Sequence, residues 1–239
     1  MRHIVVTGGG TGIGKAIATA FNKDGNEVII TGRRPEPLAA TAAELGGGLR
    51  AVRFDAADPL QVQQALADLP ASVDVLVNNA GGNTDIGAPD PADLTELADA
   101  WHANLAANIL SAVLVTSALQ DRLVPGGAVI SISSIAAHRA GAGSYAAAKA
   151  AVEAWNLTLA REVGQAGITA NVVSPGFIDG TEFFGGRMTD ERRTALVAQT
   201  ANGRAGAPGD VAAMVAFLAS PGARHVTGQT IHVNGGALS

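Results

Sequence analysis

The sequence predicts an α/β fold: a doubly wound, mostly parallel sheet of seven strands with helices on both of its faces. The main observation is that short runs rich in β-branched residues alternate with longer helix-compatible stretches along the whole chain. That order is typical of parallel strands joined by helical crossovers. The short runs are also apolar almost throughout, as expected of strands that are covered on both faces.

Each element follows from this alternation in chain order. Strands are expected at residues 3–7, 27–31, 49–54, 73–77, 128–133, 168–174 and 229–233. The stretches between them have the length and composition of helices at residues 13–24, 35–45, 59–69, 92–119, 145–166 and 210–219. No linker, repeat or low-complexity tract divides the chain, so residues 1–239 are expected to form one domain.

Composition limits the classes of function. Hydrophobic residues make up 47% of the chain, which is ample for a sizeable core. A net charge of −5 and the lack of any Lys/Arg run argue against a nucleic-acid partner. The chain has no cysteine, which excludes disulfides and cysteine-ligated metals, and no metal site is expected. We expect a cytoplasmic protein without a membrane span, because no uncharged apolar run approaches the length of one.

A glycine-rich turn, T-G-G-G-T-G-I-G at residues 7–14, joins the first strand to the first helix. Glycines in such a turn let the backbone approach a pyrophosphate closely, and the helix N-terminus attracts the anion. A nucleoside-triphosphate loop is excluded because Lys15 is followed by Ala16 rather than Ser or Thr. The turn therefore predicts a Rossmann-type dinucleotide site. The expected contacts are Gly8, Gly10, Thr11, Gly12, Ile13 and Gly14.

The end of the second strand indicates which dinucleotide binds. NAD-binding chains usually place an acidic residue about 20 residues past the glycines, where it holds the ribose 2′-hydroxyl. Here the corresponding position is Gly32, and Arg33 and Arg34 follow it. A guanidinium pairs with a 2′-phosphate that an acid would repel. NADP(H) is therefore predicted over NAD(H), although two arginines would also suit a solvated loop.

Tyr145 and Lys149 lie one helical turn apart with only alanines between them. Their side chains share one face of the helix. A nearby cation lowers the pKa of a phenol, which brings it closer to the range that acid–base catalysis needs. On spacing alone, however, such a pair is more typical of a packed ring beside a solvated charge, so the decision rests on the rest of the chain.

Several motifs together resemble the short-chain dehydrogenase/reductase family in its compact single-domain form, which includes ketoacyl carrier-protein reductases. They are the turn at 7–14, Asn78-Asn79-Ala80-Gly81, Asn104, Ile132-Ser133-Ser134, Tyr145-x-x-x-Lys149 and Asn171-Val172-Val173-Ser174-Pro175-Gly176. Each motif alone is weak. Their order and spacing match over essentially the whole chain, which makes the resemblance specific.

The resemblance implies a catalytic set of Asn104, Ser134, Tyr145 and Lys149. Tyr145 would exchange a proton with the substrate oxygen, and Ser134 would hydrogen-bond that oxygen. Lys149 would hold the nicotinamide ribose and lower the pKa of Tyr145, while Asn104 would hold a water. Further cofactor contacts are implied at Asp55, Asn79, Ala80, Gly81, Pro175, Gly176 and Ile178. Asp55 also suits a helix cap, and Asn104 a polar position on an amphipathic helix.

Two departures from the family pattern leave alternatives open. The stretch from Ser134 to Tyr145 is about two residues shorter than in many relatives, which makes Ser133 a rival for the catalytic serine; strand register favours Ser134. The family motif also places a threonine where this chain has Gly180. Thr181 is then the expected contact to the cofactor carboxamide, after a shift of one residue.

Residues 177–202, the insertion segment, interrupt the strand–helix alternation. The segment contains a helix-compatible stretch at 190–200 and the apolar side chains Phe183, Phe184 and Met188. A lid over the substrate is favoured over an ordinary surface loop. Nearby polar residues could line the mouth of the site or dock a carrier protein, or simply be solvated: His138, Arg139, Arg187, Arg192 and Arg193.

The residues and the resemblance together predict an NADP(H)-dependent oxidoreductase that interconverts a ketone and a secondary alcohol, with Tyr145 as the general acid/base. The reductive direction is favoured over an oxidative alcohol dehydrogenase and over a non-catalytic NADP-binding regulator. The resemblance also implies a homotetramer, since relatives pair their two long helices across an interface and use the C-terminal strand at a second one.

Overall fold

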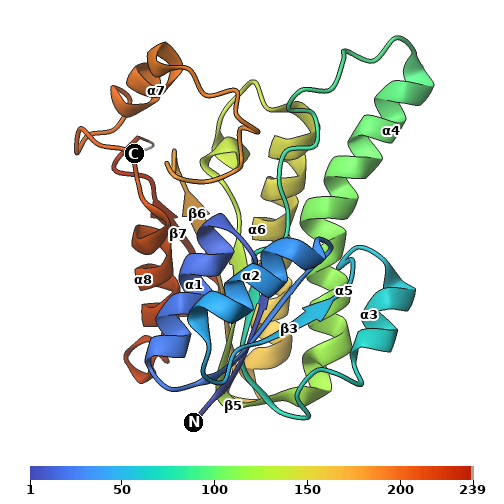
Figure 1. Ribbon diagram of the computed structural model, residues 1–239, viewed down its shortest axis with the longest axis vertical. Helices are drawn as coiled ribbons and strands as arrows, with labels where there is room; N and C mark the ends of the chain where they lie inside the picture. The colour runs from blue at the N-terminus through green and yellow to red at the C-terminus, as the bar shows by residue number, and fades with distance from the viewer. Residues whose placement is uncertain (238–239) are drawn as a thin grey trace.

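The computed structural model describes residues 1–237, and its centre is a seven-stranded sheet with the order β3-β2-β1-β4-β5-β6-β7 (Figure 1). All six strand pairs are parallel, which confirms the doubly wound α/β prediction and makes the sheet entirely rather than mostly parallel. The strands are β1 His3–Thr7, β2 Glu27–Gly32, β3 Arg50–Arg53, β4 Val73–Asn78, β5 Leu123–Ile132, β6 Thr169–Pro175 and β7 Thr230–Val233.

Helices cover both faces of the sheet (Figure 1). They are α1 Gly12–Lys23, α2 Pro35–Leu45, α3 Pro59–Ala65, α4 Leu94–Leu105, α5 Ser111–Leu119, α6 Gly143–Gly164, α7 Asp190–Val197 and α8 Pro208–Leu218. Side chains alternate along each strand, so Ile4 and Val6 of β1 pack in one core cluster with α1, α2 and α8. Val5 packs in the other, with α3, α5 and α6.

The strand order reverses between β1 and β4, and this reversal positions the candidate site. Ile4 to Val6 of β1 pair with Val75 to Val77 of β4, whereas the chain continues from β1 to the other neighbour, β2. In open α/β sheets the crevice beyond the carboxyl ends of two such strands is the place where ligands bind. The glycine-rich turn and Asn79 follow these two strand ends directly.

The long helix expected at residues 92–119 is divided into three parts. Between α4 and α5, residues Ala106–Leu110 form a π-helical turn. Such turns are rare inside α-helices and often occur at functional sites. The turn contacts α6, so the irregularity lies against the helix that carries Tyr145 and Lys149.

The expectation about apolar runs was wrong for this part of the chain. Residues Leu94–Arg122 form a helical stretch of 29 residues with a mean hydropathy of 1.4 in its most apolar window, long and apolar enough by composition to cross a membrane. The core helix of a soluble protein passes the same test. Buried Thr116 here accepts a hydrogen bond from Asn78 of β4 at 2.8 Å, which is a contact of a helix packed on a sheet.

The insertion segment lies at the end of the molecule where α4 begins (Figure 1). Its helix, α7, is three residues shorter than the predicted 190–200, and Thr189 caps its start by accepting a hydrogen bond from the backbone N–H of Arg192. Before α7, Gly185 and Gly186 both have a left-handed backbone, with φ of 55° and 77°. Two such residues in succession favour glycine, which explains why the chain turns sharply there.

Candidate active site

The glycine-rich turn has the geometry that anion binding requires. Gly8 has a φ of 65° and Gly12 a φ of 51°, both in the left-handed region that favours glycine. A side chain on Gly14 would place its Cβ 2.1 Å from the carbonyl oxygen of Gly8, so any side chain there would force the turn apart. Thr11 precedes α1 without making a side-chain cap, which leaves the first N–H groups of the helix available to a phosphate.

Asn79 ties the end of β4 to this turn. Its side-chain amide donates to the carbonyl oxygens of Thr7 and Gly8, each at 3.0 Å. The Thr7 hydroxyl oxygen in turn accepts from the backbone N–H groups of Asn79 and Ala80, also at 3.0 Å. The predicted cofactor residues of these two loops are therefore held together as one rigid unit at the carboxyl edge of the sheet.

The two arginines after β2 are exposed and face acidic groups. Nη1 of Arg33 lies 3.8 Å from a carboxylate oxygen of Asp55, and Nη2 of Arg34 lies 2.7 Å from a carboxylate oxygen of Glu182 in the insertion segment. Both guanidinium groups are more than half exposed, so a phosphate can reach them. The helix cap that was the alternative for Asp55 is instead made by Asp58, which accepts from two backbone N–H groups of α3.

Tyr145 is buried, with 5% of its surface exposed. Burial raises its pKa from 10.0 to about 12, and a hydrogen bond with Ser134 offsets only part of that rise. The net shift is therefore upward, opposite in direction to the lowering that was expected from Lys149. Desolvation dominates because the ring lies under the insertion segment, where the phenolate would lose its hydration.

Lys149 is also buried, and its ammonium group has a defined partner. Nζ donates to the carbonyl oxygen of Ile132 at 2.8 Å and lies 5.8 Å from the centre of the Tyr145 ring. Burial lowers the pKa of Lys149 from 10.5 to about 8. The pair thus shares one small volume, as the helical spacing predicted, but each group is shifted toward its neutral form.

The two neighbouring serines have different surroundings. Ser134 is the one that hydrogen-bonds Tyr145, and its oxygen also accepts from the backbone N–H of Ala136 at 3.2 Å. Ser133 is buried and donates to the backbone oxygen of Lys149 at 3.1 Å and to Glu153 at 2.6 Å. Ser133 therefore serves the packing of α6, and the geometry favours Ser134 as the serine of the site.

Asn104 is completely buried, and its side chain bonds to protein groups on both sides. Its amide nitrogen donates to Asp85 and to Ser144, and its oxygen accepts from the backbone N–H of Thr84. The sequence analysis missed a second asparagine, Asn108, which lies in the π-helical turn. The spacing of four residues from Asn104, which puts both on one face of a helix, was the available signal.

Asn108 clamps the loop after β4. Its side-chain oxygen accepts from the backbone N–H of Gly82 at 3.0 Å, and its nitrogen donates to the carbonyl oxygen of Gly82 at 2.9 Å. A Cβ on Gly81 would lie 2.6 Å from the same side-chain oxygen. The π-helical turn therefore fixes the predicted cofactor residue Gly81 from behind.

Aromatic residues of the insertion segment cover the tyrosine. The ring of Phe183 lies 5.7 Å from that of Tyr145, centre to centre, and Phe184 contacts Phe183 at 5.0 Å. The Arg192 guanidinium lies over the ring of Phe184 at 4.9 Å. Arg187 of the same segment packs so closely on Gly87, in the loop after β4, that a Cβ there would lie 2.2 Å from the guanidinium.

The start of the insertion segment is anchored beside the glycine-rich turn. A Cβ on Gly12 would lie 3.5 Å from the methyl group of Thr181, so Thr181 lies beside the glycine-rich turn. Gly176 approaches Asn234 so closely that a Cβ would lie 2.8 Å from the asparagine side chain. Pro175 is buried, and Ile178 is buried and forms a bridge to Gly206, which places the predicted carboxamide contacts against the sheet.

Polar residues near the mouth of the site are tied to other parts of the chain. Nε2 of His138 lies 2.8 Å from Glu153, and Arg139 donates to Gln199 at 2.7 Å and to the carbonyl oxygen of Ala237. Arg193 pairs with Asp179. Within residues 1–237, no group of three His, Asp or Glu side chains is arranged to hold a metal ion.

Comparison with known proteins adds a family to this geometry. Residues 8–237 match the family model described as enoyl-(acyl carrier protein) reductase. The 3-oxoacyl-acyl-carrier-protein reductase FabG of Salmonella typhimurium is 36% identical over 239 residues, covering 97% of this chain and 95% of the relative. FabG of Vibrio cholerae is 37% identical over 238 residues, with the same two coverages.

A solved structure with a similar fold contains a nicotinamide cofactor. The short-chain dehydrogenase of Burkholderia cenocepacia, crystallised with NADP, has a TM-score of 0.88 and 34% identity, and the match covers 99% of this chain and 97% of that one.

Proposed function

Because the chain belongs to the short-chain dehydrogenase/reductase family, we propose that it transfers a hydride between NADP(H) and a ketone/secondary-alcohol pair, in the reductive direction. The observation that carries this proposal is the group formed by buried Tyr145 and Lys149 with the partly buried Ser134 beside them. It lies at the carboxyl edge of the sheet, where the glycine-rich turn offers free N–H groups to a dinucleotide.

The fit of a dinucleotide is supported by the turn itself. Gly8, Gly12 and Gly14 leave no side chain between the backbone and a pyrophosphate, and α1 presents its uncapped N-terminus. For NADP(H), the support is the exposed pair Arg33 and Arg34 and the absence of an acid at Gly32. The NADP-bound Burkholderia relative supports the same cofactor.

In the proposed reaction Tyr145 acts as a general acid. When bound, NADPH supplies the hydride that reduces the carbonyl carbon. A pKa of about 12 keeps the phenol of Tyr145 protonated at neutral pH, so its proton is available to the substrate oxygen. The Ser134 oxygen accepts a hydrogen bond from the backbone N–H of Ala136, so its hydroxyl hydrogen is available for donation to the substrate oxygen. Negative charge develops on that oxygen during reduction.

Lys149 has a supporting role in this proposal. With a pKa of about 8 it is mostly protonated at pH 7, and an ammonium group beside the phenol stabilises the tyrosinate left after proton transfer. The family resemblance adds a contact from Lys149 to the nicotinamide ribose. Asn104 remains in the proposed site, although both hydrogens of its side-chain amide already bond to protein groups.

The oxidative direction is the second candidate, with the same residues. It requires Tyr145 to accept a proton and therefore to begin as the phenolate. Burial that raises the pKa to about 12 disfavours that form, which is the specific observation in favour of reduction. A non-catalytic NADP-binding regulator would have no need for Ser134, Tyr145 and Lys149 together.

The test is NADPH oxidation over a panel of ketones by wild type and Tyr145→Phe, which removes only the hydroxyl. We expect the variant to lose about 10²- to 10⁴-fold in kcat, the usual contribution of a positioned acid. Ser133→Ala, which changes the adjacent serine that bonds to α6, is the matched control and should keep most of the rate. Equal rates for wild type and Tyr145→Phe would overturn the assignment, and no turnover by either would favour the regulator.

We also propose a homotetramer without membrane or nucleic-acid partners, in the cytoplasm. The support for assembly is an apolar stripe on α4, where Leu94 is 82% exposed and Leu97 and Trp101 are each 42% exposed. Their spacing of three and four residues puts them on one helix face, and the neighbouring helix α6 adds Leu157. An exposed stripe of this kind usually marks a protein interface.

A further inference from the structure

Ser144, the residue before Tyr145 in the sequence, belongs to a hydrogen-bonded cluster with Asp85 and Asn104 that does not touch the Tyr145 hydroxyl in the proposed proton transfer. The side-chain nitrogen of Asn104 donates to Asp85 Oδ1 and to Ser144 Oγ, each at 2.9 Å. Ser144 Oγ donates to Asp85 Oδ2 at 3.0 Å. We call these three side chains the Asp85 cluster.

The Asp85 cluster is closed and mostly buried. Asn104 has no exposed surface, and Ser144 has 4%. The remaining acceptor, Asn104 Oδ1, receives the backbone N–H of Thr84 at 3.1 Å, so both amide hydrogens and the oxygen of Asn104 are used. A buried polar network in which every group is satisfied holds its members in one arrangement.

The Asp85 cluster also joins three separate elements at the beginning of α6. Asp85 belongs to the loop after β4, Asn104 to α4, and Ser144 to the first turn of α6. That first turn lacks a fixed start of its own. The residue before it, Ala142, makes no side-chain cap, and Gly141 and Gly143 both have left-handed backbone. The contacts that fix the start of α6 must therefore come from other elements.

We propose that the Asp85 cluster positions Tyr145, by fixing the first turn of α6 against α4 and the loop after β4. Asn104 and Ser144 are then positioning residues, and the inference rests on the proposed role of Tyr145 as the acid. Misplacement of a reacting group by about 1 Å can cost about 10²-fold in rate. A hydrogen bond one residue from the phenol is placed to prevent such a shift.

The cofactor loop has separate anchors, which allows a specific test. Asn79 is held by Thr7 and Gly8, and Gly82 by Asn108; Asn108 also donates to the backbone oxygen of Asn104, a bond that substitutions of the Asp85 and Ser144 side chains do not remove. Loss of the cluster should therefore lower kcat and leave the dissociation constant of NADPH unchanged. A variant that is only destabilised would have a lower melting temperature, and its kcat and its dissociation constant for NADPH would change together.

The variants are Ser144→Ala, Asp85→Asn and the double variant, with Ser111→Ala as the matched control. Ser111 is also 4% exposed and also loses one hydrogen bond, to the carbonyl oxygen of Ala107. We expect kcat to fall about 10- to 100-fold in both single variants and to stay near wild type in the control. NADPH binding is followed by its fluorescence in the folded variants, so the dissociation constant is measured independently of turnover.

The double variant tests whether the members act as a unit. Residues in one hydrogen-bond network are non-additive, so the double variant should be no slower than the slower single one. The proposal would be overturned if the kcat losses of the two single variants multiplied in the double variant. It would also be overturned if Ser144→Ala and Asp85→Asn had the same kcat as Ser111→Ala. If Ser144→Ala fails to fold, the comparison of Asp85→Asn with the control decides alone, because Asp85 is only partly buried.

Failure of this inference is distinct from failure of the proposed function. Tyr145→Phe is measured in the same assay as the reference. A wild-type rate for Tyr145→Phe would remove the function and the inference together. An inactive Tyr145→Phe beside a fully active Ser144→Ala would remove only the inference.

Discussion

At the scale of single residues, the site contains two ionisable groups whose pKa values are both shifted by burial toward the neutral form. Burial raises the pKa of the Tyr145 phenol and lowers that of the Lys149 ammonium. Both shifts cost folding free energy when the charged form is required, and catalytic sites commonly carry such costs. Helical spacing predicted the correct neighbours but the wrong direction for the pKa shift of Tyr145, because spacing contains no information about desolvation.

The cost at Lys149 can be measured as a dependence of stability on pH. Its pKa is about 8 when folded and 10.5 when exposed, so its contribution to stability is full above pH 10.5 and is lost as pH falls toward 8. At pH 7 the charged, buried group costs about 3 kcal/mol at most. Lys149→Met removes that cost and also a hydrogen bond worth about 1 kcal/mol.

We therefore expect Lys149→Met, without cofactor, to unfold at higher urea concentration than wild type at pH 7, with a gain of about 2 kcal/mol. The gain should shrink as the pH is raised to 10, while catalysis is lost at every pH. Lys23→Met, at the exposed end of α1, is the control and should show no such pH dependence. A gain that grows with pH would contradict the burial argument.

The arginines after β2 give a prediction about cofactor choice. Arg33→Ala and Arg34→Ala should each raise KM for NADPH about tenfold or more, since a charge-assisted hydrogen bond is worth about 1.5–3 kcal/mol. KM for NADH should hardly change, because the 2′-phosphate is the only group that differs. Arg50→Ala, an exposed arginine paired with Glu27, is the control. Equal losses with both cofactors, or a wild-type preference for NADH, would overturn the NADP(H) assignment.

At the scale of elements, the insertion segment decides how accessible the tyrosine is. The sequence indicated a lid from Phe183 and Phe184, and the structure places Phe183 against the Tyr145 ring. Ion pairing between Glu182 and Arg34 ties the same segment to the cofactor side of the cleft. A substrate that reaches the phenol must therefore displace or share the surface that Phe183 now covers.

The effect of Phe183 on the pKa of Tyr145 can be measured, because Tyr145 is the only tyrosine in the chain. Its ionisation can be followed by phenolate absorbance, with tryptophan fluorescence as a separate monitor of unfolding. In wild type we expect the titration to occur well above 10, toward the pKa of about 12. Phe183→Ala should lower this pKa by exposing the ring to water. A tyrosine whose pKa is higher in the folded than in the unfolded protein contributes stability that is lost as the pH rises from 10 to 12. Phe183→Ala should therefore lose less free energy of unfolding over that pH range than wild type.

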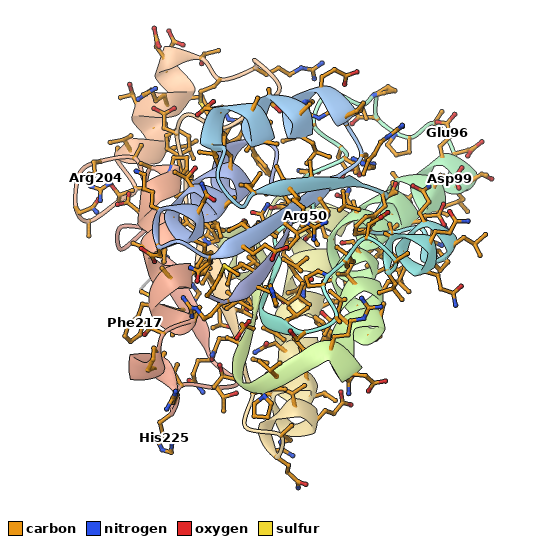
Figure 2. The ribbon with its side chains drawn as sticks, turned by 60° about the horizontal axis from the view of Figure 1, so that its bottom comes forward. Arg50, Glu96, Asp99, Arg204, Phe217 and His225 are labelled. Atoms are coloured by element: carbon orange, nitrogen blue, oxygen red, sulfur yellow. The ribbon has the colours of Figure 1, made fainter. Side chains whose placement is uncertain are left out.

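Phe217→Ala is the control for the tyrosine titration, since Phe217 lies on the outer side of α8 and is half exposed (Figure 2). This variant should titrate as wild type does. A Phe183→Ala protein whose tyrosine titrates at the same pH as wild type would show that other groups keep the phenol dry.

At the scale of the whole molecule, one helix face remains without a partner within residues 1–237. The stripe of Leu94, Leu97 and Trp101 is exposed on α4, while Glu96 and Asp99 of the same helix project outward (Figure 2). The chain therefore exposes an apolar stripe beside charged groups, which is the pattern of an interface core with a polar rim.

Assembly through this face predicts the effect of one substitution. Wild type should scatter light as a tetramer at micromolar concentration, and Trp101→Glu should shift the mass toward smaller species by placing a charge in the interface core. His225→Glu, at an exposed position away from α4 (Figure 2), should leave the mass unchanged. A monomer peak for wild type would refute the assembly, and an unchanged mass for Trp101→Glu would exclude this face.

The sequence by itself determined the fold class, the strand positions and the identity of the residues that meet at the carboxyl edge of the sheet. Periodicity and glycine spacing are local properties, and six motifs in a fixed order restrict the topology strongly. Thus β1 and α2 begin and end where the pattern placed them, and Tyr145 lies beside Lys149 as their spacing indicated.

Only the tertiary structure decided what surrounds each of these groups. The choice between Ser133 and Ser134, the raised pKa of Tyr145 and the partners of Asn104 all depend on contacts between segments far apart in the chain. Asn104 and Ser144 are 40 residues apart, and no local pattern brings them together. Desolvation and hydrogen bonding follow from packing, so they became visible only when the elements had been placed against one another.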